Sequence, residues 1–421
     1  MTAPFGSSGR ASTGSWTAKS TTSGFFWDCQ NNKGMKNVQK RKLGRLSVLL
    51  MAGAGAMALV PLTGVGTAGA SGASSGTSTV YVTNDGSCGN RPSYSTIAAG
   101  LAAAPPNGTV IVCGGTFNED AVITQPVTLI SRGAVINPSA PVVQTNSPLY
   151  SKVGNNGITI AAPNVTVQGF TVTGATGDGI FSFANNSTIT DNESNGNGST
   201  GISLNGSSWS RVAGDVTNKN AAGGITLTND AGAIIPGATA SHDVVTNNVS
   251  NGNLGGCGII LADHLGSTVP GAQGIFDNVV TDNTVNNNGN VPAASGAGVI
   301  LATEAPGGAV YSNLIANNDA TGNGLAGVTF HSHMAGQNFT GNVVTSNTFG
   351  PNNGGGDFAD PSTTGVYLGS VSPLTVKVTN NNFINNVNGI FAAGPVTVLG
   401  VWSNSFRHVT VPLATTPTYA G

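Results

Sequence analysis

The chain has 421 residues, of which 62 are glycine and only 8% are charged, and its formal net charge is −2. Disordered chains combine high charge with few branched apolar residues, whereas this chain repeats Val, Ile, Leu and Phe in short runs. The composition therefore argues against a disordered chain and favours a turn-rich, all-β protein with apolar surface to bury.

Residues 1–70 are typical of a targeting sequence. A basic stretch starts at Met35 (MKNVQKRKLGR), an apolar stretch runs from Leu46 to Val65, and Ala68-Gly69-Ala70 fits an A-x-A cleavage site. We expect residues 1–70 to be an N-terminal extension and a cleaved signal peptide, with translation starting at Met35. The protein would then be secreted or displayed on the cell surface. A single membrane anchor is the alternative, because the apolar stretch is about long enough to span a bilayer.

Removal of residues 1–70 would leave an acidic protein. That segment holds eight of the 15 Lys and Arg residues and one of the 17 Asp and Glu residues, so the remainder carries a formal charge of −9. The seven remaining basic residues are scattered, which makes a poor surface for nucleic acid or an anionic membrane. We therefore expect neither partner for the mature protein, and we expect it to be a monomer.

The rest of the chain reads as a Gly/Ser/Thr linker, 71–78, followed by one domain, 79–421. We divide the domain into a cap with a first coil (79–137), repeats (138–408) and a C-terminal cap (409–421). A helix in the first part is expected to cover the open end of a strand stack. The expected elements are a strand at Thr79–Thr83, a helix at Tyr94–Ala104, and strands at Thr109–Cys113, Ala121–Ile123, Val127–Ile130 and Val409–Leu413.

The segment Tyr94–Ile130 resembles a known family. Its sequence, YSTIAAGLAAAPPNGTVIVCGGTFNEDAVITQPVTLI, is similar to the N-terminal cap and first coil of the pectin-lyase-like superfamily of right-handed parallel β-helix proteins. The superfamily contains lyases, hydrolases, esterases, epimerases and non-enzymatic surface proteins, so the resemblance implies a fold and no single activity. The Asn-Thr-Asp, Asp-Asp, Gly-His-Gly and Arg-Ile-Lys motifs of its pectin hydrolases do not occur in this chain.

Two motifs repeat along the chain. The first is Gly-(Ile/Val)-x-(Leu/Phe), at intervals of 22 to 24 residues for one coil and 29 to 40 for one coil plus a loop. It opens at Gly179, Gly201, Gly224, Gly258, Gly298, Gly327, Gly365 and Gly389. The second ends in an asparagine that we expect to form a ladder between coils, interrupted at Lys219. Its asparagines are Asn192, Asn248, Asn283, Asn318, Asn347, Asn381 and Asn404.

Three cysteines follow residue 70. Cys88 and Cys113 lie 25 residues apart in the cap region, and in an exported protein we expect them to form a disulfide. Cys257 lies inside a strand motif, GGCGIIL, and is expected to be a buried small apolar residue rather than a reactive thiol.

A column of ionisable residues accompanies the glycine motif. The sixth residue after the glycine is ionisable in four successive coils, and two more ionisable residues stand at offsets five and four. Even offsets alternate with the inward positions, so His331 and His333 should project from one outer face, beside a groove formed by the loops that follow. The candidate site consists of Asp230, Asp263, His264, Glu304, His331 and His333.

This candidate site fits two kinds of chemistry. A histidine flanked by carboxylates can act as a general base near neutral pH, and a shielded glutamate can act as an acid. The same side chains could instead ligate a divalent metal. A transition metal is favoured, since His-x-His on a strand presents both rings on one side, and Ca²⁺ is less well supported. Asp357 and Asp360 form a second cluster, for which a turn-forming or Ca²⁺-binding role is expected.

Two functions remain open from the sequence. The first is a secreted protein that interacts with carbohydrate as a polysaccharide lyase, epimerase or glycoside hydrolase, with the His/Asp/Glu column as its site. The second is a non-catalytic extracellular or cell-surface β-helix that binds a polysaccharide or cell-surface glycan through its loops. No basic residue lies near the column to neutralise an acidic substrate, the closest in register being Arg211 and Lys219.

Overall fold

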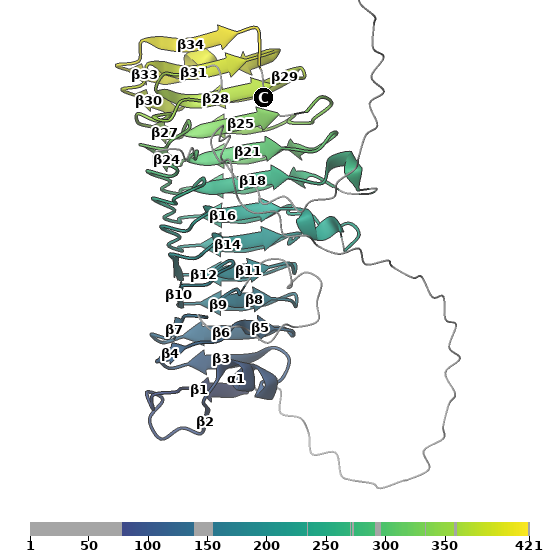
Figure 1. Ribbon diagram of the computed structural model, residues 1–421, viewed down its shortest axis with the longest axis vertical. Coiled ribbons are helices and arrows are strands. Elements are labelled where there is room, and N and C mark those ends of the chain that lie inside the picture. Colours follow the sequence, from purple (N-terminus) through teal and green to yellow (C-terminus); the bar gives the residue numbers. More distant parts are fainter. Residues whose placement is uncertain are drawn as a thin grey trace, which may run out of the picture.

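The computed structural model describes residues 78–419 except 139–154, 234, 270, 272, 291–295, 333 and 358–359. The expected signal peptide and all but the last residue of the linker lie outside the described residues. The described chain is a parallel β-helix, in which strands from successive coils stack along one long axis (Figure 1). Its one α-helix is α1 (Ile97–Ala103), near the N-terminal end.

A 13-stranded parallel sheet forms one wall of the helix. In spatial order its strands are β2 (Ser93–Tyr94), β1 (Thr79–Val82), β3 (Gly108–Val112), β6 (Val127–Ser131), β9 (Thr166–Gln168), β12 (Thr188–Thr190), β15 (Arg211–Ala213), β17 (Val244–Thr246), β20 (Val279–Thr281), β23 (Leu314–Ala316), β26 (Val343–Thr345), β29 (Leu374–Thr379) and β32 (Val396–Leu399).

An 11-stranded parallel sheet forms a second wall and contains all eight glycine motifs. Its strands are β5 (Ala121–Ile123), β8 (Ile158–Ile160), β11 (Ile180–Ser182), β14 (Thr200–Asn205), β16 (Gly223–Thr228), β18 (Ile259–Asp263), β21 (Val299–Thr303), β25 (Val328–Ser332), β28 (Thr364–Ser370), β31 (Asn388–Ala393) and β34 (Val411–Thr416). The motifs pair in consecutive order, so the predicted stack of eight rungs is confirmed.

The third wall consists of very short strands. One group is β4 (Thr116–Phe117), β7 (Val135–Ile136), β10 (Thr171–Thr173) and β13 (Glu193–Asn195), and the other is β24 (Asp319–Ala320), β27 (Thr348–Phe349), β30 (Asn382–Ile384) and β33 (Ser405–Arg407). Single bridges through Val216, Val249 and Thr284 connect the two groups. A separate pair, β19 (Ile275–Phe276) and β22 (Val310–Tyr311), lies where two loops return to the stack.

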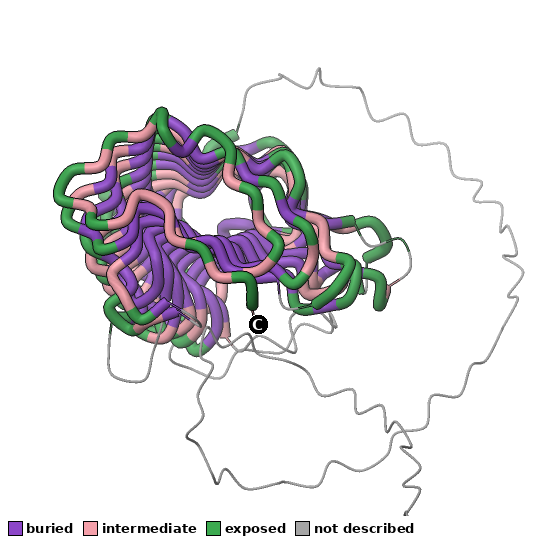
Figure 2. Tube along the Cα trace, turned by 90° about the horizontal axis from the view of Figure 1, so that it is seen from above, coloured by how far each residue is buried: buried purple, intermediate pink, exposed green. Residues whose placement is uncertain are grey.

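The core runs unbroken along the axis, with buried residues lining the inside of every wall (Figure 2). The first and third residues after each motif glycine are buried, as predicted, and from Gly201 to Gly365 both join the same apolar cluster in successive rungs. Pairs such as Ile225 and Leu227 stack directly on Ile259 and Leu261 in the next coil. Parallel strands lie about 4.8 Å apart, so equivalent side chains contact one another along the axis.

The glycines at the start of these strands allow coils to approach closely. A Cβ atom added to Gly224 would lie 2.6 Å from the carbonyl oxygen of Gly258 in the next coil, well inside van der Waals contact. The corresponding glycines meet the carbonyl of the next rung in the same way, for example Gly258 against Gly298 at 2.7 Å. This column is therefore restricted to glycine by space, which explains the regularity of the motif.

Three ladders of side-chain hydrogen bonds connect the coils at the corners. In each ladder a side-chain oxygen accepts the backbone N–H of the equivalent residue one coil earlier. The first ladder is Asn192, Asp215, Asn248, Asn283, Asn318, Asn347, Asn381 and Asn404. The second is Asn197, Asn220, Asn253, Asn288, Asn323, Asn352 and Asn386. The third is Ser187, Ser210, Asp243, Asn278, Asn313 and Asn342.

The ladders correct one expectation and reveal a fixed spacing. The rung between Asn192 and Asn248 is Asp215, so the interruption falls there and not at Lys219. Lys219 belongs to a column of left-handed turn residues that includes Gly196 and Gly252. In every coil that has members of all three ladders, the residue numbers increase by five from the third ladder to the first and by five again from the first to the second. Ser187, Asn192 and Asn197 are an example.

Side chains from the first full coil hold helix α1 in place. The carboxylate of Glu119 accepts the N–H groups of Ile97 and Ala98 at 2.7 and 3.0 Å, and the hydroxyl of Thr96 accepts that of Ala99. The amide of Gln125 donates to the carbonyls of Leu101 and Ala104 at the other end. The helix begins at Ile97, three residues after the expected Tyr94, because Thr96 caps it in an extended conformation.

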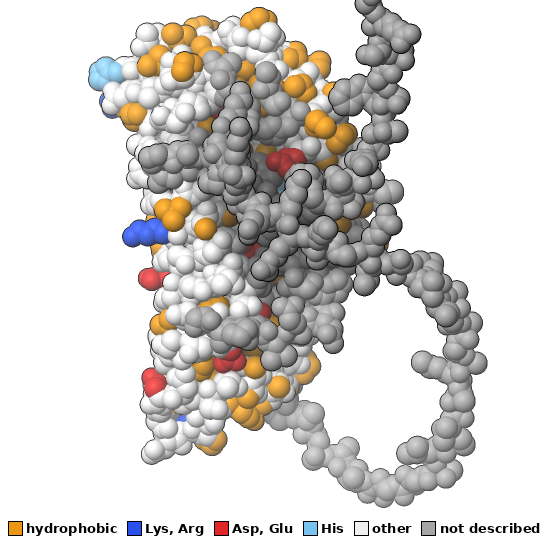
Figure 3. Space-filling view, viewed as in Figure 1, with side chains coloured by type: hydrophobic (Ala, Val, Ile, Leu, Met, Phe, Trp, Pro, Cys, Tyr) orange, Lys and Arg blue, Asp and Glu red, His pale blue; other side chains and the backbone are white. Residues whose placement is uncertain are grey.

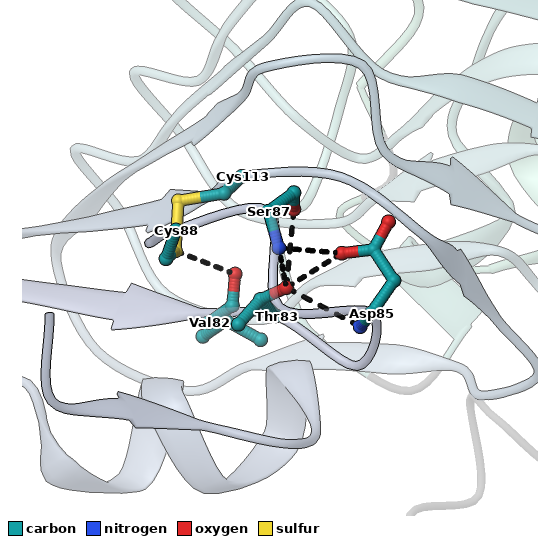
Figure 4. Close-up of a disulfide and its surroundings, with 6 residues drawn as sticks. All are labelled: Val82, Thr83, Asp85, Ser87, Cys88 and Cys113. Atoms are coloured by element: carbon teal, nitrogen blue, oxygen red, sulfur yellow. Dashed lines mark hydrogen bonds between the residues drawn. A yellow bond between two sulfur atoms is a disulfide. The ribbon is translucent and has the colours of Figure 1, made fainter. Parts of the chain in front are cut away.

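A disulfide connects the N-terminal loop to the stack. Cys88 follows β1 and bonds to Cys113 at the end of β3, as predicted (Figure 4). In the same loop, Asp85 accepts the N–H of Ser87 and the hydroxyl of Thr83. The hydroxyl and the N–H of Ser87, followed by the hydroxyl of Thr83, lower the pKa of Asp85 to about 2. Disulfide bonds such as Cys88–Cys113 persist in oxidising compartments, which is consistent with an extracellular protein. Cys257 is buried, as predicted, in a small apolar cluster with Ile260 and Ile300.

At the C-terminal end, the last strand, β34, begins two residues after the expected Val409. Within the described part of the chain, no helix is long and apolar enough to cross a membrane.

Candidate functional site

Asp230, His264 and Glu304 start the loops that leave the 11-stranded sheet from β16, β18 and β21. Asp230 opens a 3₁₀ turn (Asp230–Ala233), and a second 3₁₀ turn (Gly266–Thr268) follows His264. Strand pairing aligns Thr228 with Ala262 and Asp263 with Thr303, so the residues two positions after Thr228 and Ala262 face each other across adjacent coils. The counting of offsets from the glycine motif therefore places Asp230 and His264 correctly as neighbours.

The pair is in direct contact. The Oδ1 atom of Asp230 lies 2.8 Å from Nδ1 of His264, and the hydroxyl of Thr228 lies 3.2 Å from both that nitrogen and Oδ2 of Asp230. The Asp230 side chain is 44% exposed and that of His264 is 21% exposed, so the pair sits at the surface rather than in the core. Thr228 was not anticipated, although its offset of four from Gly224 puts it in the same column as His331.

The carboxylates determine the charge of His264. Burial alone would lower the pKa of its imidazole, but the charge and hydrogen bond of Asp230, followed by the charges of Glu304 and Asp263, raise it above its usual value. Burial likewise opposes ionisation of Asp230, and the charge and hydrogen bond of His264 together with the Thr228 hydroxyl hold its pKa below the usual range. Each side chain of the pair therefore favours the charged form of the other.

Asp263 plays a different part from its neighbours. Its Oδ1 accepts the N–H groups of Leu265 and Gly266 at 2.9 Å and the side-chain amide of Asn229 at 2.7 Å, while Oδ2 accepts the N–H of Ala309. The residue is 2% exposed. With four donors from three loops, this carboxylate fixes the loop bases beside His264 and is poorly placed to meet a ligand itself.

His331 lies away from this centre. It pairs in register with Ala302, whose side chain carries no polar group, and its Nε2 lies 3.0 and 3.1 Å from the two carboxylate oxygens of Asp357. Both residues are buried, and the imidazole meets the ring of Tyr367 edge to face. The structure therefore places His331 in a second, enclosed cluster under the loop that precedes β28, and not in an open groove with His264.

The second cluster extends to Asp360 and Tyr419. Asp357 and Asp360 pair with each other through their backbones, and Asp360 also accepts hydrogen bonds from Ser362 and Thr364. Burial raises the pKa of Asp360. The ring of Tyr419, from the C-terminal segment, lies over Gly369, and burial together with the charge of Asp357 raises its pKa. This arrangement is that of a closed turn, in keeping with the turn-forming role expected for the two aspartates.

The remaining members of the candidate site are Glu304 and His333. Glu304 is exposed at the start of its loop and contributes to the charge at His264. His333 lies outside the described residues. Among the residues that the structure describes, no group of three or more His, Cys, Asp or Glu side chains is arranged to hold a metal ion.

No family model and no curated protein matches the chain. Several solved structures share its architecture. An alginate lyase from Paenibacillus sp. str. FPU-7 is 14% identical, with a TM-score of 0.48 over 81% of this chain and 99% of that one. The pectate lyase Pel9A is 17% identical, with a TM-score of 0.45 over 77% and 78%. PfbA, a surface adhesin of Streptococcus pneumoniae, is 14% identical, with a TM-score of 0.48 over 75% and 86%.

At this level of identity the likeness is one of fold. The parallel β-helix with an N-terminal helix, expected from the resemblance of Tyr94–Ile130 to the pectin-lyase-like superfamily, is confirmed by the strand pairing described above. Two of the named proteins are lyases and one is an adhesin, so the likeness assigns no activity to this chain.

Proposed function

We propose that this protein acts on an extracellular polysaccharide, with Asp230, His264 and Glu304 as its acid–base centre. The observation that carries the proposal is the 2.8 Å contact between Asp230 and His264 in a column that continues to Glu304. These side chains stand on consecutive coils about 4.8 Å apart, so they suit an extended, repeating ligand that runs along the axis. Hydroxyl-rich sugars match such a row of hydrogen-bonding groups.

In this proposal the two kinds of side chain have different roles. The carboxylates raise the pKa of His264 and so favour its protonated form, which can donate a proton to a leaving oxygen. Asp230 holds the imidazole in place through Nδ1, as an orienting carboxylate does in other acid–base sites. Glu304, exposed at the next rung, is the candidate proton acceptor. This assignment covers hydrolysis, elimination and epimerisation alike.

The test is a screen of neutral and acidic polysaccharides for product release. We expect H264A and E304Q to lose about 100-fold or more of the activity, the usual size of an acid–base contribution. D282N removes an exposed carboxylate from a turn remote from the centre and serves as the matched control. Unchanged activity in H264A, or no product from any polysaccharide with the wild-type protein, would contradict the catalytic proposal.

The pH profile tests the same centre in another way. Activity that needs protonated His264 falls as the pH rises through the raised pKa of this residue. Removing the charge of Asp230 in D230N takes away the first of the carboxylates that raise this pKa. We therefore expect the alkaline limb of the rate profile to move to lower pH in D230N. A limb that stays in place would show that His264 does not set it.

A non-catalytic glycan-binding protein is the second candidate, and one observation favours it. Two of the six residues of the candidate site, Asp263 and His331, are occupied by structural contacts, the first with loop backbone and the second with Asp357. A β-helix whose charged side chains mainly fix the conformation of its loops could still bind a glycan through those loops without catalysing a reaction. Retained glycan binding together with absence of product in the screen would support this alternative.

A further inference from the structure

We propose that a strip of aromatic side chains, separate from the acid–base centre, binds the apolar face of a pyranose ring, with Trp209 as the contact residue. The aromatic strip consists of Trp209, His242, Phe276 and Tyr311, one from each of four successive coils. It lies where the loops return to the stack. Those that begin at Asp230, His264 and Glu304 reach His242, Phe276 and Tyr311 respectively.

The rings of the strip contact one another along the axis. Trp209 stacks on His242 with ring centroids 4.0 Å apart and planes 14° apart. His242 meets Phe276 edge to face at 5.7 Å, and Phe276 stacks on Tyr311 at 5.0 Å. His242 also lies 3.6 Å from the carboxylate of Asp277. These contacts hold the indole of Trp209 in one orientation before any ligand arrives, which lowers the entropic cost of binding.

Trp209 is open to solvent in spite of this stacking. One face of its indole is covered by His242, yet the residue is 62% exposed, so the opposite face and the ring edges must account for the exposed area. Sugar rings present C–H groups on one face and hydroxyls at the rim, and they stack on flat aromatic surfaces for the same reason that other apolar groups do. Hydrogen-bonding partners for the rim lie nearby, in Asp277 and in the exposed Arg211 two residues along.

The backbone at Trp209 gives an independent argument. Its φ is 61°, in the left-handed region, where a bulky side chain is strained. The equivalent positions of the other coils carry Asn164, Asn186, His242, Asp277, Ser312 and Gly341, nearly all of them residues that tolerate this conformation. A tryptophan here is unfavourable both for the backbone and for solvation, since its side chain remains largely exposed. Strain retained at a residue whose side chain stays largely exposed points to a function.

Trp402 provides a matched control. It is also exposed, at 81%, but it lies in the 3₁₀ turn Val401–Ser403 near the C-terminal end, far along the axis from the strip. Loss of a tryptophan at that position removes similar apolar surface without touching the strip. A difference in glycan affinity between variants at the two positions is therefore due to the aromatic strip and not to non-specific binding by exposed indoles.

The experiment is calorimetric titration with two probes, a β-1,4-linked glucose hexasaccharide and an α-1,4-linked galacturonate hexasaccharide. We expect W209A to weaken binding of at least one probe about tenfold or more, as for an aromatic hot-spot residue, and W402A to bind like wild type. Loss of binding to the galacturonate probe alone would assign the site to acidic glycans, with Arg211 as the charge partner. Equal binding by W209A and wild type, or no binding of either probe by wild type, would overturn the proposal.

A second variant at Trp209 distinguishes loss of glycan binding from loss of folding. W209N places at this position the residue that the coils before it use, so its melting temperature should equal or exceed that of the wild type while its glycan binding is lost. The inference does not depend on catalysis at His264. Binding that is lost in W209N but kept in H264A would support the strip whether or not H264A retains activity, and the failure of one proposal would leave the other standing.

Discussion

Two aspartates stand among the asparagines and serines of the ladders, and they alone among these rungs carry a carboxyl group. Asp215 stands in the first ladder and Asp243 in the third, and each uses Oδ1 to accept the backbone N–H of the preceding rung. Neither Oδ2 has a hydrogen-bond partner within the described structure. In the asparagine rungs the corresponding NH₂ group donates to a backbone carbonyl, as Asn248 does to Val212.

Burial raises the pKa of Asp215 to about 7 and that of Asp243 well above its usual value. A protonated carboxyl can donate where an asparagine would, so these two side chains act as neutral substitutes for asparagine. The unfolded chain gives up the proton near its ordinary pKa of about 4, while the folded chain keeps it to a higher pH. The folded state therefore loses stability relative to the unfolded state as the pH rises from about 4 to about 7.

We predict that D215N and D243N each increase the free energy of unfolding at pH 7, by about 2 kcal/mol, because they supply the missing donor. The gain should shrink towards pH 4, because the aspartates of the wild type become protonated in both states as the pH falls through and below their unfolded-state pKa. Urea unfolding at both pH values measures it. The reverse change, N248D, introduces the same defect one rung away from Asp215 and should destabilise the protein more at pH 7 than at pH 4. Equal stabilities at pH 7 would show that the aspartates already have donors.

At the scale of elements, helix α1 shows how a cap is assembled from distant sequence. Its first turn has no acidic residue of its own, and Glu119, some twenty residues later, supplies the carboxylate that accepts the N–H groups of Ile97 and Ala98. The helix has only seven residues, too few to be stable alone. Its stability comes from this capping and from burial of Ile97 and Leu101 against the first coils.

We predict that E119A destabilises the cap by about 1–2 kcal/mol, since two N–H groups at the start of the helix lose their acceptor. Hydrogen exchange at Ile97 and Ala98 should speed up, while exchange in β21 and β25, many coils away, should stay unchanged. E193A, an exposed glutamate at a strand of the third wall, is the control. Unaltered exchange in α1 would mean that packing alone holds the helix.

The elements also show what sequence reasoning could and could not reach. The strand register is fixed by the motif glycines, so counting from them placed Asp230 beside His264. The pairing of His331 with Asp357 could not be predicted from the sequence, because it depends on the loop before β28 folding back over the sheet. The aromatic strip was missed because Trp209, His242, Phe276 and Tyr311 follow loops of different lengths and share no common offset.

For the whole molecule, the two ends of the stack differ. The N-terminal end is closed by α1, by β2 and by the Cys88–Cys113 disulfide. At the other end β32, β33 and β34 are the last strands of their sheets, and core residues such as Val398, Phe406 and Leu413 are only partly buried. The charged side chains that can be seen in Figure 3 stand apart from one another. Coils contact only their neighbours, so stability should vary with distance from each end.

We predict that unfolding starts from the C-terminal end. Native-state hydrogen exchange should be fastest in β32 to β34, slower in β28 and β29, and slowest near the middle of the stack. Reduction of the disulfide should speed up exchange at the N-terminal end and so reduce the difference between the two ends. A bridge around a loop of this length contributes about 3 kcal/mol to the stability of the N-terminal end. Uniform exchange along the stack would instead indicate a single cooperative unit.

The fixed five-residue spacings between the three ladders divide each coil into a constant part and a variable part. From the third ladder to the second the chain keeps one length in every coil, while all the differences in coil length fall in the segment that contains the 11-stranded sheet and its loops. The three ladder corners and the two walls between them therefore keep a constant length, and the remaining side is free to lengthen. A protein built in this way can acquire or lose a loop beside Asp230, His264 and the aromatic strip without altering its frame, so the loops and the stack can evolve almost independently.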